Sequence, residues 1–201
     1  MFKNFPRCPF ERYADDAVVH CVSEAEAREV LAALQERFLQ VGLELHPEKT
    51  RIVYCKDSNR PGSYENEQFT FLSYTFRPRL TKNKSGKCFV GFLPAASSEV
   101  AKELRRQIKG WRLHQRTGHT LQDLADWINP IVRGWIWYYG RFNRSVMDPT
   151  LRRINDYLVR WARGKYKRLR TSRRRGWTWL EMVFRRSPSL FAHWRLVGAK
   201  F

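Results

Sequence analysis

Positive charge and tryptophan are concentrated in the second half of this 201-residue chain, and this asymmetry constrains the fold most strongly. Residues 1–95 carry 14 basic and 12 acidic side chains, whereas residues 96–201 carry 24 and 7. All eight tryptophans lie between Trp111 and Trp194. We therefore expect a division near residue 95 into two parts with different tasks.

The overall charge of +19 and a pI near 10.4 favour a polyanionic partner, because a compact protein of this charge repels itself. Nucleic acid is the leading partner class, and a basic protein of the membrane surface is the weaker alternative. No run of about 18 uncharged apolar residues and no signal peptide is visible, so we expect a soluble cytoplasmic protein with no membrane partner. With 43% hydrophobic residues the chain can build a core.

The four cysteines, Cys8, Cys21, Cys55 and Cys88, are widely spaced and form no CxxC pair. This spacing argues against a zinc knuckle and against a disulfide framework. The sequence therefore predicts reduced thiols.

Residues 1–95 read as an α+β arrangement. Apolar runs at 10–13 and 17–21 flank Asp15 and Asp16, which predicts a hairpin with two carboxylates at its tip, between buried strands. Ser23 and Glu26 then form a capping box for a helix that ends at Gly42. Further strands are predicted at 43–45, 51–55, 69–76 and 88–92, with turns at 46–49 and 83–86.

Residues 96–201 read as all-helical. Helices are predicted from Ser97 or Ser98, from Thr120 and after Pro149, with a short helical segment at 179–184 and an aromatic tail. Pro130 lies inside the second helix, so we expect a break or kink just before it.

Two adjacent carboxylates on a tight turn repel one another unless a cation neutralises them. Oxygen ligands suit Mg²⁺, which in nucleotidyl transfer clamps the attacking and leaving oxygens. On the dipeptide alone, Asp15 and Asp16 read more readily as ordinary solvated turn residues than as metal ligands.

The surrounding sequence resembles a known family. FERYADD at 10–16 resembles the YADD box of reverse transcriptases encoded by bacterial and organellar group II introns. Blocks at 42–50, 69–76 and 128–139 follow in the family's order, and the last resembles the core of the maturase-specific thumb, called domain X. Ser73 stands where the family more often has Gly, and Trp137 where it often has Asn.

The resemblance implies the C-terminal half of a polymerase palm at 1–95 and a basic helical thumb with its tail at 96–201. Asp15 would bind Mg²⁺, Asp16 would assist the site, and Tyr13 would lie beside the primer end. Lys49 would approach phosphate, with a solvated turn lysine as the alternative. His46 reads as a turn residue rather than a general base.

Family members draw a first metal-binding aspartate and the fingers from sequence before the YADD box, and this chain begins twelve residues before Tyr13. We therefore expect a C-terminal fragment that shows no polymerase activity alone and uses Mg²⁺ only in a complete palm. The missing fingers–palm fragment is a candidate partner, and no small-molecule cofactor is expected.

Several thumb residues interleave cations with aromatics, a pattern suited to phosphate contact and base stacking. Of these, Arg133 is expected to be the exposed contact, and Trp135 with Tyr138 or Tyr139 is expected to be at least half-buried. A dense one-sign charge run also favours polyanion contact over a merely solvated face. The RNA-binding candidates are Lys49, Arg133, Trp135, Tyr138, Tyr139, Lys165, Lys167, Arg168, Arg173, Arg174 and Arg175.

Three functions are consistent with the sequence. The chain is part of an RNA-directed DNA polymerase that handles RNA template, DNA primer and structured intron RNA. Alternatively, it is a non-catalytic RNA-binding maturase fragment that assists splicing, or the remnant of a decayed mobile element. The tail FAHW at 191–194 resembles the family's C-terminal signature and is expected to pack.

Overall fold

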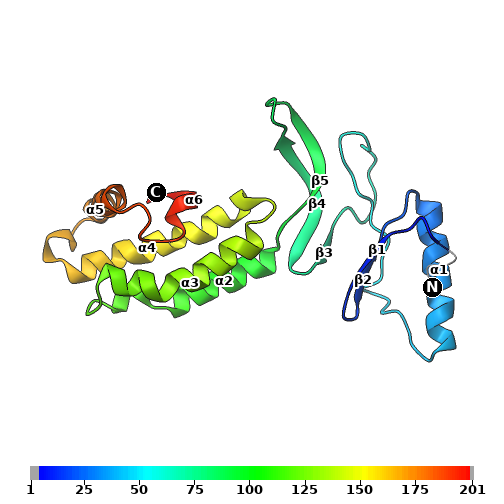
Figure 1. Ribbon diagram of the computed structural model, residues 1–201, viewed down its shortest axis with the longest axis horizontal. Coiled ribbons are helices and arrows are strands. Elements are labelled where there is room, and N and C mark those ends of the chain that lie inside the picture. Colours follow the sequence, from blue (N-terminus) through cyan, green and yellow to red (C-terminus); the bar gives the residue numbers. More distant parts are fainter. Residues whose placement is uncertain (1–4, 200–201) are drawn as a thin grey trace. The chain divides into compact units, whose positions relative to one another are not determined.

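The computed structural model describes residues 5–199 and divides into two compact units (Figure 1). The hairpin unit comprises the residues up to Leu72 and Phe76–Phe92, and the helical unit comprises Ser73–Thr75 and the chain from Leu93 onward. Helices and two small antiparallel sheets confirm the predicted α+β class. The division lies close to residue 95, but the short segment Ser73–Thr75 belongs with the helices.

The hairpin unit begins with strands β1 (Phe10–Tyr13) and β2 (Asp16–Val19), which pair antiparallel from Phe10↔Val19 to Tyr13↔Asp16. Helix α1 (Glu24–Gln40) follows, capped by the Ser23 side chain. The hairpin and the helix are confirmed, but the expected burial of the strands is wrong. All of β1 is exposed and Val30 is the only residue of α1 that is buried, because no third strand within residues 5–199 joins the two-stranded sheet.

The segment after α1 is irregular where strands were predicted at 43–45 and 51–55. Gly42 takes the left-handed φ of 70° that ends the helix, and the Leu43 N–H donates to the Phe38 carbonyl. Residues 51–55 are linked to the remainder of the loop chiefly by the Tyr54 N–H, which donates to the Asn66 carbonyl at 2.8 Å. Apolar alternation alone does not make a strand where no partner strand is in register.

A three-stranded sheet of order β3-β4-β5 follows, with strands Phe69–Phe71, Tyr74–Lys82 and Cys88–Ala96. The predicted single strand at 69–76 is interrupted because Leu72 and Ser73 have φ of 49° and 68°. Glycine adopts such angles without cost, which explains why the resembled family more often has Gly at position 73. The predicted turn at 83–86 is confirmed between β4 and β5.

The helical unit contains α2 (Ser98–Gly110), α3 (Leu121–Tyr139), α4 (Asp148–Lys165), α5 (Arg173–Arg186) and the short α6 (Trp194–Val197). Three 3-10 turns, Leu113–Gln115, Arg144–Met147 and Lys167–Leu169, lie between them. Helix α5 is longer than the predicted segment at 179–184, because the Ser172 side chain caps the helix and it begins at Arg173. Within residues 5–199, no helix is both long enough and apolar enough to span a membrane.

Helix α4 is the centre of the helical unit, where it contacts α2, α5 and α6 (Figure 1). The helix predicted after Pro149 is confirmed, and its apolar residues Leu151, Ile154, Leu158 and Trp161 are fully buried. Helix α3 runs through Pro130 without the predicted break. Burial of Ile128 and Val132 on either side outweighs the missing backbone hydrogen bond.

Two buried asparagines fasten the C-terminal tail to the helices. Asn129 donates to the Leu190 carbonyl and accepts from the Ala192 N–H, both at 2.8 Å. Asn155, fully buried in α4, donates to the Gly198 carbonyl at 2.9 Å. The FAHW tail is therefore packed as predicted, and its hydrogen bonds go to helices far away in the sequence.

The oxygen of the Asn155 amide also fixes the state of His193. It accepts from Trp194 Nε1 at 2.9 Å and lies 2.8 Å from His193 Nε2, so Nε2 carries the proton. His193 Nδ1 is buried with no hydrogen-bond partner among residues 5–199. A second ring proton would therefore enter the core without an acceptor.

This arrangement predicts a specific pH dependence. Burial lowers the pKa of His193 from 6.5 to about 3. Between these two pH values the imidazole binds a proton in the unfolded chain but not in the folded chain. The contribution to stability is complete above about pH 6.5 and declines by up to about 1.4 kcal/mol per unit as the pH falls towards 3. The free energy of unfolding, measured with urea, should decline less between about pH 7 and pH 5 in His193→Gln than in the unaltered chain. The exposed His46→Gln control should keep the full decline, and identical slopes for all three proteins would contradict this role.

Candidate nucleic-acid interface

Asp15 and Asp16 lie at the tip of the β1–β2 hairpin. Asp15 is in the two-residue turn, and Asp16 opens β2 opposite Tyr13. Ala14 has a φ of 52°, which is uncommon for a non-glycine residue, and its carbonyl accepts a hydrogen bond from Arg12 Nε at 2.8 Å. The Arg12 side chain thus supports the strained turn that presents both carboxylates.

Tyr13, Asp15 and Asp16 are all exposed. Among residues 5–199, no third His, Cys, Asp or Glu side chain approaches them closely enough to form a metal-binding group. Mg²⁺ takes six oxygen ligands in near-octahedral geometry. The two carboxylates have the right chemistry but supply only part of such a site.

Lys49 lies in the predicted turn, where the Thr50 N–H donates to the His46 carbonyl at 2.9 Å. The side chains of Lys49 and His46 are both exposed, so the ammonium group of Lys49 can reach a phosphate. The structure assigns His46 only a backbone contact in this turn.

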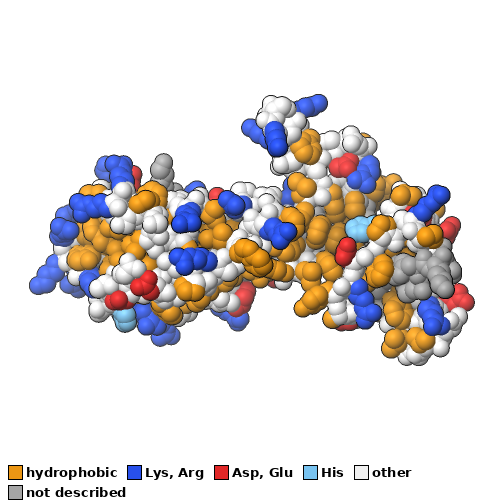
Figure 2. Space-filling view, viewed as in Figure 1, with side chains coloured by type: hydrophobic (Ala, Val, Ile, Leu, Met, Phe, Trp, Pro, Cys, Tyr) orange, Lys and Arg blue, Asp and Glu red, His pale blue; other side chains and the backbone are white. Residues whose placement is uncertain are grey.

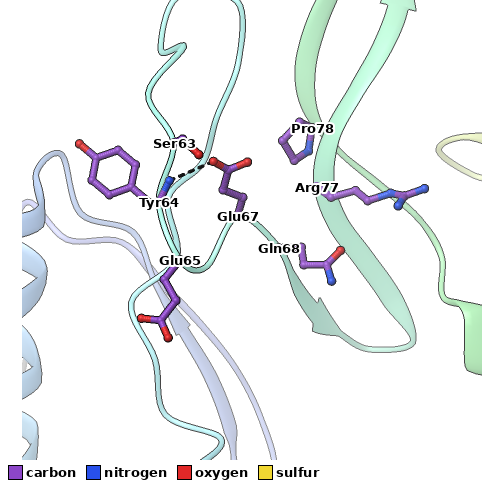
Figure 3. A pocket seen from close by; sticks show the side chains of 7 residues that line it. All are labelled: Ser63, Tyr64, Glu65, Glu67, Gln68, Arg77 and Pro78. Carbon is purple, nitrogen blue, oxygen red and sulfur yellow. Dashed lines mark hydrogen bonds between the residues drawn. The ribbon is translucent and has the colours of Figure 1, made fainter.

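The hairpin unit also has a shallow pocket of about 470 Å³ (Figure 3). On one side of it, Glu67 accepts from the Tyr64 N–H at 3.1 Å and pairs with Lys56, contacts that lower the pKa of this carboxyl. The predicted site residues of this unit, Asp15, Asp16 and Lys49, do not line it. The lining residues are Ser63, Tyr64, Glu65, Glu67, Gln68, Arg77 and Pro78.

In the helical unit, α3 presents Arg133, Trp137 and Tyr138 on its exposed side. Arg133 and Trp137 are four residues apart and therefore neighbours on the helix surface. Trp137 is 76% exposed, which is unusual for so large an apolar side chain. The one sequence signal for this residue is its departure from the Asn that is frequent in the resembled family, and no binding role was predicted for it.

The neighbouring aromatic side chains are largely structural. Trp135 is buried, as predicted, and its ring stacks on Trp111 with ring centroids 5.3 Å apart, so that ring packs in the core. Helical periodicity turns position 135 towards the core and position 137 away from it. Tyr139 is half-buried and packs with Tyr138 against Tyr74, whose hydroxyl donates to the Tyr138 carbonyl.

The basic run after α4 divides into one structural lysine and a set of exposed cations. Lys165 is half-buried, and its ammonium donates to the carbonyls of Thr117 at 2.9 Å and His119 at 2.6 Å. It also lies 5.2 Å from the Trp161 ring centroid. The exposed members of the run are Lys167, Arg168, Arg170, Arg173, Arg174 and Arg175.

The first turn of α5 consists of Arg173, Arg174 and Arg175. This turn contains no acidic residue. Cations at a helix N-terminus oppose the helix dipole, so this turn favours a bound anion. Arg173 pairs with Asp156 at 3.3 Å, and Arg175 contacts the Arg168 carbonyl and the Thr171 hydroxyl. Figure 2 shows Lys and Arg side chains spread over the visible face of the helical unit, with apolar side chains between them.

Comparison with protein families matches both halves of the chain. Residues 1–76 match the model of reverse transcriptase (RNA-dependent DNA polymerase), and residues 101–179 match that of the group II intron maturase-specific domain. Searches of curated proteins and of solved structures found no match. The Arg133 face and the start of α5 both lie inside the second matched range.

The two kinds of lysine in the basic run can be separated experimentally. Lys165→Met should lower the free energy of unfolding by about 2 kcal/mol, because two carbonyls lose a charged donor. Lys167→Met, on an exposed side chain, should change it by less than about 0.5 kcal/mol. Urea denaturation of both variants checks this, and equal stabilities would show that the Lys165 contacts contribute nothing.

Proposed function

Because the chain belongs to the group II intron reverse transcriptase and maturase family, we propose that its helical unit binds structured intron RNA and assists splicing. The observation that carries this proposal is the exposed Arg133–Trp137–Tyr138 face of α3, in a unit that also has six exposed cations between residues 167 and 175.

The two groups of residues suit different parts of RNA recognition. Arginine and lysine contact phosphates without regard to sequence, and these contacts supply most of the affinity. Exposed aromatic rings stack on unpaired bases, which occur in the loops and bulges of a folded RNA. The start of α5 therefore provides affinity, and the α3 face provides preference for structured RNA.

The α5 contribution can be measured by salt dependence. If about six phosphates are contacted, log K should fall with log salt at a slope of roughly −4, from about 0.7 per contact. Replacing Arg173, Arg174 and Arg175 together by Gln should flatten this slope by about two units. Filter binding at several salt concentrations gives the slope.

The matched control is Lys82→Gln, Lys84→Gln and Lys87→Gln, which removes three exposed charges near the β4–β5 turn of the hairpin unit. This variant should keep a slope near that of the unaltered chain. If the slope of log K against log salt flattened equally in both triple variants, RNA binding would depend on net charge alone. That result would contradict the assignment to α5.

Preference for a folded intron should depend on α3. Trp137→Ala or Arg133→Ala should reduce the ratio of affinities for a folded group II intron and an unrelated RNA of equal length, by about tenfold for a lost stacking contact. The α5 triple variant should weaken both RNAs alike. Competition binding measures the ratio, and equal affinities before any substitution would contradict the maturase proposal.

RNA-directed DNA polymerase activity is a second proposal, favoured by the exposed Asp15 and Asp16 on their strained turn. We propose that Mg²⁺ is their cation and that the remaining ligands come from a further palm segment acting with this chain. Asp15 would hold the ion, Asp16 would support it, and Tyr13 and Lys49 would contact primer or template.

This proposal is tested by adding a fingers–palm fragment of a group II intron reverse transcriptase in trans. Primer extension with Mg²⁺ should appear only in the mixture, because two carboxylates cannot position two ions alone. Asp15→Asn should reduce it more than Asp16→Asn. Extension by the chain alone, abolished by Asp15→Asn, would overturn the proposed division of the site.

A further inference from the structure

Two cysteines that are far apart in the sequence lie opposite one another at the open end of the β1–β2 hairpin. Strand pairing runs from Tyr13↔Asp16 to Phe10↔Val19, and the His20 N–H continues the ladder by donating to the Pro9 carbonyl at 2.8 Å. The next facing positions are Cys8 and Cys21. Their thirteen-residue separation resembles no zinc motif, which is why the sequence alone predicted only reduced thiols.

Glu26 brings a carboxylate to the same point. The two sulfur atoms and a carboxylate oxygen of Glu26 all lie within 4.8 Å of one another. Glu26 belongs to the first turn of α1, where its N–H donates to the Ser23 hydroxyl at 3.2 Å and its Oε2 accepts from the Val22 N–H at 2.7 Å. These hydrogen bonds at the start of α1 fix the position of the Glu26 carboxylate beside the two sulfur atoms.

These three groups are shielded from water to different degrees. Cys8 is 3% exposed, and Cys21 and Glu26 are half-buried. Burial, with Glu26 and Cys21 nearby, raises the pKa of Cys8 to about 11. Without a cation the thiols therefore stay protonated, whereas a divalent cation at this point would stabilise the thiolates and the carboxylate together.

We propose that Cys8, Cys21 and Glu26 form a binding site for one thiophilic divalent cation of the Zn²⁺ type, with water as the fourth ligand. Zn–S bonds of about 2.3 Å and Zn–O bonds of about 2.0–2.2 Å place tetrahedral ligand atoms about 3.4–3.8 Å apart. In the structure the three ligand atoms lie within 4.8 Å of one another, so they need to approach by about 1 Å to reach this spacing. Coordination through one Glu26 oxygen leaves the other to keep the Val22 hydrogen bond, a common way to orient a metal ligand.

A disulfide between Cys8 and Cys21 is the competing arrangement. It needs the sulfur atoms about 2.05 Å apart and leaves the Glu26 carboxylate facing an uncharged bond. The metal site uses all three groups, and it would tie the base of the hairpin to the start of α1. This site is at the opposite end of the hairpin from Asp15 and Asp16, so its test is independent of the proposed RNA and polymerase functions.

The proposal is tested with the whole chain, reduced and freed of metal by a chelator, and titrated with Co²⁺ as a coloured substitute for Zn²⁺. One Co²⁺ per chain should produce a thiolate-to-cobalt charge-transfer band in the near ultraviolet, and Zn²⁺ should abolish it. Cys21→Ser should weaken binding at least tenfold, and Glu26→Gln should weaken it while keeping the band. The Cys55→Ser and Cys88→Ser double variant is the matched control and should bind as the unaltered chain does.

Cys21→Ser is the primary variant because Cys21 is less buried than Cys8, and circular dichroism verifies its fold. The proposal is overturned if the folded, reduced chain gives no charge-transfer band, or if Cys21→Ser leaves the band and affinity unchanged. It is also overturned if the band disappears in the Cys55 and Cys88 double variant. Recovery of a Cys8–Cys21 disulfide in place of bound Zn²⁺, when Zn²⁺ and a mild oxidant are offered together, would favour the competing arrangement.

Discussion

The hydrogen bonds of two buried asparagine side chains tie the C-terminal tail of the helical unit to helices that lie far away in the sequence. Asn129 and Asn155 reach 61 and 43 residues along the chain to carbonyls of the C-terminal tail. Because the amides are buried, loss of either would leave polar groups unsatisfied in the core, at about 1–3 kcal/mol for each group. The tail is thus part of the core that supports the outward face of α3, and the position of Arg133 and Trp137 depends on it.

The hairpin unit contrasts with this arrangement. Its aspartates lie on an exposed turn, and α1 buries a single residue. In the described part of the chain, β1 and β2 pair only with one another. The helical unit has a continuous core of its own that includes Trp161, Phe191 and Trp194. This difference in burial is why we propose that the helical unit can bind intron RNA by itself, whereas polymerase chemistry needs a further palm segment.

Local signals predicted the helices well, since Ser23, Ser97 and Thr120 each cap where expected. Errors arose where the outcome depends on distant residues. The local sequence does not show that a strand lacks a pairing partner, or that core packing keeps α3 helical at Pro130. The same limit applies to the candidate sites. Exposure of Arg133 and burial of Trp135 were predicted from periodicity, but the contacts of Lys165 and the proximity of Cys8 to Cys21 require the folded chain.

The central claim is that the helical unit contacts structured RNA through α3 and the start of α5. Ultraviolet crosslinking of the whole chain to a folded group II intron RNA, followed by mass spectrometry of the crosslinked peptides, tests it most directly. Crosslinks should concentrate on the peptides that contain Trp137, Tyr138 and residues 167–175. Crosslinks confined to the hairpin unit, or spread over all exposed basic segments without preference, would contradict the claim.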